Sequence, residues 1–179
     1  LVTGATLDAG LQKALDDTLS KLPIPKVMTY QLHQGCELPG WSSVQFVRPA
    51  HGLVALHGEA VVPVSVLGLK AGRSTHGHRF EAACDPIEFA SADDYAIDLR
   101  EEGSVIASFD ERRSEIARQL KAAAESLDNG LHPIEDDALL DEVTALVERP
   151  NVLVCQFEQE FLDVPQECLI LTMKANQKY

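Results

Sequence analysis

The sequence predicts an α+β fold, a mixed or antiparallel sheet with several packed helices, because strand-like runs come early in the chain and helical patterns late. Short apolar, β-branched runs at 44–47, 53–56 and 61–67 predict strands, and His57-Gly58-Glu59 predicts a hairpin turn. A chain of 179 residues with 45% hydrophobic side chains is long enough to bury one sizeable core.

A helix is expected near the start of the chain, with Asp8 as its N-cap and with Pro23 and Pro25 ending it. The leucines of its apolar stripe are Leu11, Leu15, Leu19 and Leu22. This pattern predicts an N-terminal helical segment over residues 1–22 and an α+β domain over residues 23–179.

The second half of the chain predicts mostly helices. Ser91 is expected to begin a helix that stops at Gly103, and Ser108 with Glu111 has the spacing of a capping box ahead of a long helix. Further helices are expected over 135–148 and 166–177, and short strands over 104–107 and 152–157. The side chains expected to be buried on the two longer helices are Phe109, Ile116, Leu120 and Ala124, then Leu139, Leu140, Val143, Leu146 and Val147.

The charges are distributed unevenly along the chain, whose net charge is -13. Residues 81–148 carry 19 acidic and 5 basic side chains, whereas residues 1–80 carry 7 basic and 5 acidic ones. Between Glu59 and Glu81 there is no carboxylate, and this stretch holds the basic, glycine-rich segment 70–80. A general nucleic-acid coat is therefore excluded, but local attraction of an anion such as RNA to this segment is expected.

Several kinds of chemistry lack their sequence pattern. There is no phosphate-binding glycine motif and no nucleophile elbow, and His76 with His78 lacks the further ligands that zinc needs, so neither catalysis nor a metal is expected. The carboxylates at 135–137 and 141–142 are interpreted as complementing a helix dipole. The four cysteines are expected to be reduced and packed, and the absence of a long apolar run favours a cytoplasmic location.

Six ordered blocks of sequence resemble the β subunit of bacterial glycyl-tRNA synthetase. They are Lys21-Leu-Pro-Ile-Pro-Lys26, Phe46-Val-Arg-Pro-Ala-His51, Leu67-Gly-Leu-Lys-Ala-Gly-Arg73, Thr75-His-Gly-His-Arg-Phe80, Glu142-Val-Thr-Ala-Leu-Val-Glu-Arg-Pro150 and Met173-Lys-Ala-Asn-Gln-Lys-Tyr179. The resemblance spans about residues 21–179, and it implies a piece of a longer chain.

The resemblance implies a heterotetramer with an α subunit that binds ATP and Mg and activates glycine, while β recognises much of the tRNA. It implies no cofactor on this chain and neither DNA nor a membrane as partner. The corresponding region of the family resembles the B3/B4 part of the phenylalanyl-tRNA synthetase β subunit, which carries editing in that enzyme. The fold expected from this resemblance is a B3/B4-like domain.

If the chain contacts tRNA-Gly, the residues expected to bind phosphates are Lys70, Arg73 and Arg79, with hydrogen bonds from Ser74, Thr75, His76 and His78. The second-rank candidates are Arg48, His51, Lys174 and Lys178. A simpler interpretation is an inter-strand loop whose arginines pair with the acidic helices.

Three functions remain open for this chain. The first is tRNA positioning together with support of subunit assembly, without catalysis by the chain alone. The second is a pure contact scaffold between α and β, and the third is an editing-type deacylase. Editing is disfavoured because a double sieve destroys products smaller than the cognate one, and no proteinogenic amino acid is smaller than glycine.

Overall fold

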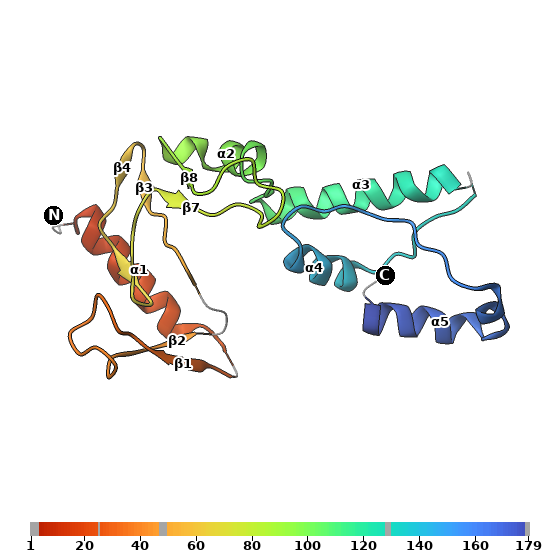
Figure 1. Ribbon diagram of the computed structural model, residues 1–179, viewed down its shortest axis with the longest axis horizontal. Helices are drawn as coiled ribbons and strands as arrows, with labels where there is room; N and C mark the ends of the chain where they lie inside the picture. Colours follow the sequence, from red (N-terminus) through yellow and green to blue (C-terminus); the bar gives the residue numbers. More distant parts are fainter. Residues whose placement is uncertain (1–3, 25, 47–49, 128–129, 178–179) are drawn as a thin grey trace.

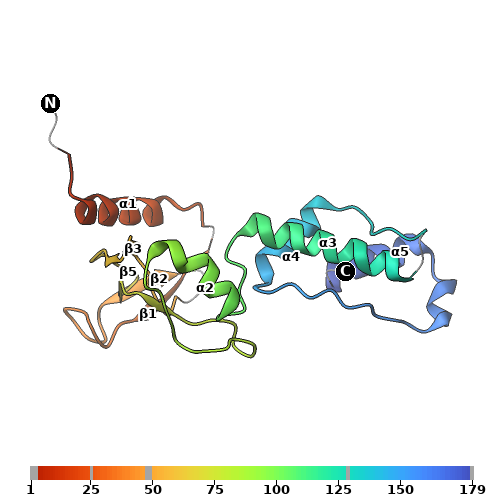
Figure 2. The ribbon, with the colours of Figure 1, turned by 90° about the horizontal axis from the view of Figure 1, so that it is seen from above.

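The computed structural model describes residues 4–24, 26–46, 50–127 and 130–177. These residues form two lobes in sequence order (Figure 1). The first lobe holds the helix α1 (Leu7–Lys21), all of the short strands and the helix α2 (Tyr95–Glu101). The second lobe holds the helices α3 (Phe109–Leu127), α4 (Asp137–Leu146) and α5 (Gln166–Thr172), and Figure 2 separates the same two lobes. The expected α+β class is confirmed.

The described strands pair as four two-stranded antiparallel ladders. The ladders are β1 (Met28–Gln31) with β2 (Ser43–Phe46), β3 (Leu56–His57) with β4 (Ala60–Val61), β5 (Ser65–Val66) with β6 (Leu69–Lys70), and β7 (Ser74–Thr75) with β8 (Ile87–Glu88). The expected hairpin around Gly58 is confirmed, since Leu56 lies opposite Val61 and His57 opposite Ala60. The strand β1 was not predicted from the sequence.

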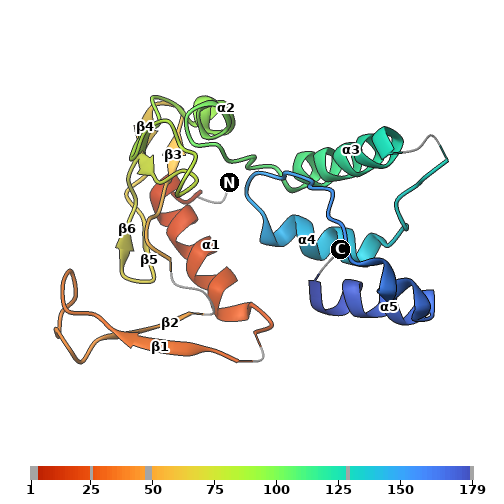
Figure 3. The same ribbon diagram turned by 45° about the vertical axis from the view of Figure 1, so that its right-hand side comes forward.

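The ladders are joined sideways by hydrogen bonds outside the strands. Val62 donates its amide to the Ala55 carbonyl, and Val54 forms a parallel bridge with Gly72. Figure 3 shows that the β1–β2 hairpin lies across one end of α1, apart from the other strands. The helix α1 is tied to the strands by the Gln12 amide, which accepts from the Ser65 amide and donates to the Ser65 carbonyl, both at 2.8 Å.

The N-cap of α1 corrects the sequence prediction. Thr6 occupies the N-cap position, with extended backbone dihedrals, and Asp8 lies within the first turn. A hydrogen bond from the Thr6 side chain, followed by the Ala9 amide, lowers the pKa of Asp8. The leucine stripe is only partly covered, because Leu19 and Leu22 are exposed.

The core of the first lobe lies between β8 and α2. Ile87, Phe89 and Leu99 are buried, with Val54 and Leu56 packed against them, and Val105 completes this cluster. Burying each of the three large side chains contributes roughly 1.5–3 kcal/mol relative to exposure. The helix of this core follows the prediction closely, because the Ser91 hydroxyl caps the 3-10 turn Ala92–Asp94 that leads directly into α2.

Two predicted strands are absent from the described residues. Residues 104–107 and 152–157 form no ladder, and Ser104 has a left-handed backbone conformation with a φ of 53°. Their polar groups bond to other elements instead: Ile106 donates its amide to the Glu148 carbonyl, and Val152 donates to the Gln119 side chain at 2.8 Å. Gln119 also donates to the Pro150 carbonyl, so this side chain holds the 150–152 segment on α3.

The three helices of the second lobe begin close to where the sequence predicts. The Ser108 hydroxyl accepts from the Glu111 amide at 3.3 Å, which confirms half of the capping box, but the Glu111 carboxylate pairs with Arg100 instead of closing it. On α4, Thr144 is fully buried and donates to the Leu140 carbonyl at 2.7 Å. The predicted inner face is wrong at Leu120 and Leu146, both of which are exposed, as is Phe109.

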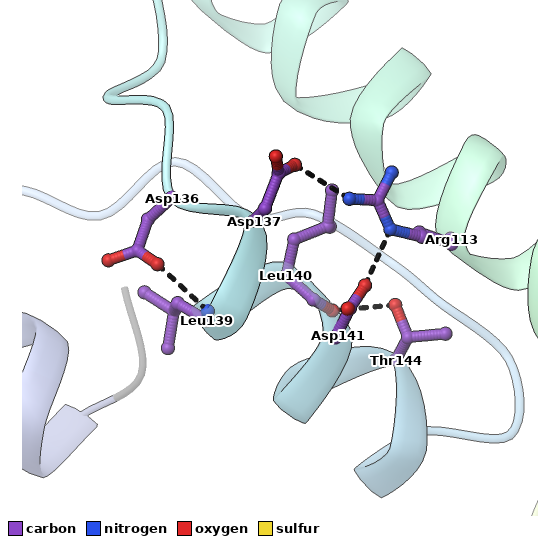
Figure 4. A network of polar contacts seen from close by, with 7 residues as sticks. All are labelled: Arg113, Asp136, Asp137, Leu139, Leu140, Asp141 and Thr144. Atoms are coloured by element: carbon purple, nitrogen blue, oxygen red, sulfur yellow. Dashed lines mark hydrogen bonds and ion pairs between the residues drawn. The ribbon is translucent and has the colours of Figure 1, made fainter.

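A charged clamp joins α3 to α4 (Figure 4). The Arg113 guanidinium donates to Asp137 at 2.7 Å and to Asp141 at 2.6 Å, and these hydrogen bonds raise the pKa of Arg113. Asp136 caps α4 by accepting from the Leu139 amide at 3.0 Å. The acidic cluster therefore complements the start of a helix, as predicted, and it also binds α3.

The cysteines differ from the prediction in their packing. All four are free, as expected, but Cys84, Cys155 and Cys168 are exposed and only Cys36 is half-buried. None of the helices within the described residues has the length and apolar character needed to cross a membrane.

We predict that Gly77→Ala destabilises the first lobe by about 1–3 kcal/mol, the usual range for forced overpacking. A Cβ at Gly77 would lie 2.6 Å from the Gly103 Cα atom and 2.7 Å from its carbonyl oxygen. Urea denaturation followed by circular dichroism measures the change. Gly52→Ala is the matched control, since a Cβ there meets nothing within 4 Å, and equal stability of the two variants would contradict the prediction.

We further predict a pH-dependent ion pair on α3. Hydrogen bonds from Arg118 and then Gln119 lower the pKa of Glu115 from 4.5 to about 2. Because the folded pKa lies below the unfolded one, this pair stabilises the fold above about pH 4.5 and loses its effect as the pH falls toward 2.

An NMR titration of the Glu115 carboxyl checks this expectation. Arg118→Ala should move its pKa upward toward 4.5. Lys121→Ala is the control, because Lys121 lies on the same helix but pairs with Glu125 at 3.9 Å. An unchanged pKa in Arg118→Ala would show that the ion pair does not form in solution.

Candidate nucleic-acid interface

The basic segment predicted from the sequence spans two ladders and the loop that follows them. Lys70 lies in β6, Ser74 and Thr75 form β7, and residues 76–86 make the loop between β7 and β8. This 76–86 loop projects from the strands of the first lobe toward α3 (Figure 1). The segment is therefore part strand and part loop.

The 76–86 loop is anchored on the residues that follow α2. His78 donates its amide to the Gly103 carbonyl at 2.7 Å, and Ala83 donates to the Glu102 carbonyl at 2.7 Å. The buried Ser104 hydroxyl donates to the Glu81 carbonyl at 2.8 Å. These three hydrogen bonds hold both sides of the loop against residues 102–104.

Arg73 lies beneath this surface and holds the strands together. Its guanidinium donates to the carbonyls of Glu59 at 2.9 Å, Phe89 at 3.2 Å and Ala90 at 3.4 Å. The side chain thus connects the β3–β4 turn to the segment after β8. The simpler interpretation, in which the arginines of the segment pair with the acidic helices, is wrong at Arg73, because the partners of Arg73 are backbone carbonyls. Phosphate binding by Arg73 stays a prediction.

Lys70 and Arg79 are the cations of the segment that face solvent. Within the described part of the chain, neither has a carboxylate within ion-pair distance. The Arg79 guanidinium carbon lies 5.7 Å from the centroid of the Phe80 ring. Both side chains can therefore reach an anion without first breaking an ion pair.

The four predicted hydrogen-bond donors have different environments. The backbones of Ser74 and Thr75 pair with Glu88 and Ile87, and the Ser74 residue is exposed. His76 is exposed and its Nδ1 atom lies 2.5 Å from Asp85 Oδ1. Among the described residues, no group of three or more His, Cys, Asp or Glu side chains is placed to hold a metal ion.

His78 is half-buried, and it acts mainly on the loop itself. Its Nδ1 atom accepts from the Phe80 amide at 3.4 Å, and its ring meets the Phe80 ring in an edge arrangement with centroids 6.3 Å apart. The imidazole thereby supports the turn that carries Arg79 and Phe80.

The acidic side chains around the 76–86 loop are engaged with partners. Besides the Asp85 contact with His76, Glu81 pairs with Arg149 at 3.0 Å, and Glu102 accepts from the Cys84 thiol at 3.2 Å. The hydrogen bond to Glu102 raises the pKa of Cys84. The segment without carboxylates in the sequence therefore has carboxylates near it in the fold, and of these Glu81 is neutralised by Arg149.

Two of the four second-rank candidates lie within the described residues. Arg48 and Lys178 lie outside the described residues, and His51 is exposed between β2 and β3. Lys174, in the final turn Met173–Gln177, forms an ion pair with Asp136 and lowers the pKa of that carboxyl. Lys174 therefore links the end of the chain to the start of α4.

A groove of about 980 Å³ lies beside the anchored loop, between the end of α2, the start of α3 and residues 149–151. Its three arginines are paired: Arg100 with Glu111, Arg118 with Glu115 at 2.6 Å, and Arg149 with Glu81 at 3.0 Å. Because each guanidinium has a carboxylate partner, the groove offers no net positive charge to a polyanion.

Sequence reasoning missed two contributors to this region. Phe80 is 85% exposed at the tip of the turn, and Arg149 links the loop to the second lobe by donating to Glu81 and to the Ser104 hydroxyl. A signal for Phe80 was present, since an aromatic residue directly follows Arg79 in the basic segment. Nothing local in the sequence indicates the Arg149 contact.

Comparison with known proteins identifies the family. A family model described as the glycyl-tRNA synthetase beta subunit matches residues 1–179. The chain is 76% identical over 179 residues to the glycine–tRNA ligase beta subunit of Polaromonas naphthalenivorans, and 74% and 73% identical to those of Paracidovorax citrulli and Delftia acidovorans. These alignments cover 99–100% of the chain and 25% of each relative. The chain, which thus spans about a quarter of the length of these relatives, belongs to the glycyl-tRNA synthetase beta subunit family.

Proposed function

We propose that this chain is part of a glycyl-tRNA synthetase β subunit and supports ATP-dependent attachment of glycine to tRNA-Gly. Its role is to help position the tRNA and to support assembly with the α subunit, and the isolated chain does not catalyse the reaction. The observation that carries the proposal is the whole-chain match to relatives named glycine–tRNA ligase beta subunit.

The proposed tRNA contact lies at Lys70 and Arg79. Both are exposed, and neither is held in an ion pair within the described residues. Phosphate contacts by such side chains supply affinity that depends on salt but not on sequence, which suits a positioning role. Ser74 and His76, both exposed, are the proposed supporting hydrogen-bond donors.

The chemistry of the reaction is proposed to lie on the α subunit, which would bind ATP and Mg. No residue of this chain is assigned to catalysis or to a cofactor. The proposed setting is cytoplasmic, where the tRNA substrate is found.

A pure contact scaffold is the second candidate, favoured by exposed apolar side chains on the second lobe. Leu153 is 73% exposed and Leu171 is 70% exposed, and Phe157, Phe161 and Leu162 are exposed as well. Apolar surface of this kind is typical of protein–protein contact sites. The occupant in this candidate is the α subunit.

The proposal includes a B3/B4-like fold for residues 23–179, with residues 1–22 as a preceding helical segment. The order of strands first and helices later supports it. Since that region carries editing in phenylalanyl-tRNA synthetase, a deacylase remains the third candidate. The His76–Asp85 contact would orient an imidazole as general base in that case.

We predict that Lys70→Ala/Arg79→Ala in the β subunit of the heterotetramer weakens binding of fluorescent tRNA-Gly. The slope of log K against log salt should become shallower by up to about 1.8, because each of the two lost phosphate contacts removes roughly 0.7–0.9. Lys13→Ala/Lys21→Ala, which removes two exposed cations from α1, is the control with equal charge change.

The titration separates the candidates. Equal salt slopes for the two double variants would contradict tRNA positioning by the segment. If the Lys70→Ala/Arg79→Ala variant also sedimented without the α subunit, the contact scaffold would replace tRNA positioning as the proposed function. Release of a noncognate amino acid from tRNA, abolished by His76→Ala, would promote the deacylase.

A further inference from the structure

Among the described residues of the first lobe, Phe80 and Trp41 are the most exposed large apolar side chains, each at 85%. Nearly the whole surface of the Phe80 ring therefore meets water, which costs the free energy that burial would have gained. Its neighbours in sequence are the charged residues Arg79 and Glu81. An exposed aromatic ring beside a cation is a combination that stacks on the bases of single-stranded nucleic acid.

The backbone beneath Phe80 is rigidly supported. The amides of Glu81 and Ala82 both donate to the His78 carbonyl, at 3.3 and 3.0 Å, and close a tight turn around Phe80. The His78 amide and the Glu81 carbonyl are both bonded to the Gly103–Ser104 segment. A ring presented on such a turn loses little conformational entropy when a ligand binds.

Two side chains flank the ring and add polarity. Arg79 places its guanidinium carbon 5.7 Å from the ring centroid, within the range of a cation–π interaction. The His78 ring meets Phe80 with an interplanar angle of 64°. A cation beside an aromatic face is the combination that binds single-stranded nucleic acid, the face stacking on a base and the cation contacting the phosphate next to it.

We propose that Phe80 is a stacking platform for one unpaired base of the bound tRNA, with Arg79 holding the adjacent phosphate. This inference rests on the proposed tRNA contact and names the part of the RNA that makes it. An unpaired base is required because the faces of bases inside a duplex are already covered by their neighbours. Contact of Phe80 with a protein partner is an outcome that the test distinguishes, because aromatic and arginine side chains are also enriched at protein interfaces.

The test uses the heterotetramer with full-length β subunit and measures tRNA-Gly affinity for Phe80→Leu, Phe80→Trp and Arg79→Ala. Leucine removes the ring but keeps apolar volume, so Phe80→Leu should raise Kd by about 5- to 100-fold without changing the salt slope. Phe80→Trp should retain the affinity, because tryptophan also stacks. Arg79→Ala should make the salt slope shallower.

Trp41→Leu is the control, since Trp41 is an aromatic residue of the first lobe with the same 85% exposure as Phe80 and lies outside the basic segment. Its tRNA affinity should equal that of the unaltered enzyme. A single-stranded RNA oligonucleotide and an RNA duplex of equal length provide the second comparison. Phe80→Leu should weaken binding of the single strand and leave duplex binding unchanged.

The failures of the two proposals are distinguishable. If Phe80→Leu binds tRNA as the unaltered enzyme does while Arg79→Ala loses salt-dependent affinity, the stacking proposal is wrong and the tRNA contact stands. If neither variant changes tRNA affinity, both are wrong. If Phe80→Leu weakens association with the α subunit at unchanged tRNA affinity, Phe80 is a protein contact and the stacking proposal is overturned.

Discussion

The close approach of Gly77 to Gly103 is the contact on which the arrangement of the candidate interface depends. A side chain at Gly103 would also collide with the Ile87 side chain, at 2.6 Å from its Cδ1 atom, and with the Leu99 carbonyl. The same short distance allows the His78 amide to reach the Gly103 carbonyl. The loop, the end of α2 and the core therefore meet at one point where only glycine fits.

The two lobes are linked next to this contact. The backbone continues from Gly103 through residues 104–107 into α3, and Arg149 donates from the second lobe to Ser104 and Glu81. Within each lobe, polar side chains take the place of regular ladders: Gln12 binds β5 and Gln119 binds residues 150–152. Each glutamine side-chain amide pairs with one backbone N–H group and one backbone carbonyl, so these groups are hydrogen-bonded without a neighbouring strand.

The charges of the chain become interpretable once their partners are known. A net charge of -13 would repel RNA from most of the surface, but the arginines of the second half are largely engaged with carboxylates. Arg73 is engaged with carbonyls. Lys70 and Arg79 differ from these because, among the described residues, neither has a carboxylate within ion-pair distance, so any attraction for a polyanion is concentrated on few side chains.

Local periodicity and turn chemistry were enough to predict the α+β class, the hairpin at Gly58, the cap by Ser91 ahead of α2 and the approximate bounds of α3, α4 and α5. The sequence also located the basic segment 70–80 and, through six blocks of residues, the family.

Which side chains of the basic segment bind other parts of the chain, and which remain free to contact a ligand, depends on tertiary contacts. Residues 104–107 and 152–157 have strand-like composition yet form no strand, since a strand exists only with a partner supplied from elsewhere in the chain. Arg73 and Arg79 belong to the same basic segment, but Arg73 donates to three carbonyls that are distant along the chain, whereas Arg79 lies beside the Phe80 ring and has no carbonyl partner among the described residues. Local patterns cannot encode such contacts, because they are made between segments that meet only after folding.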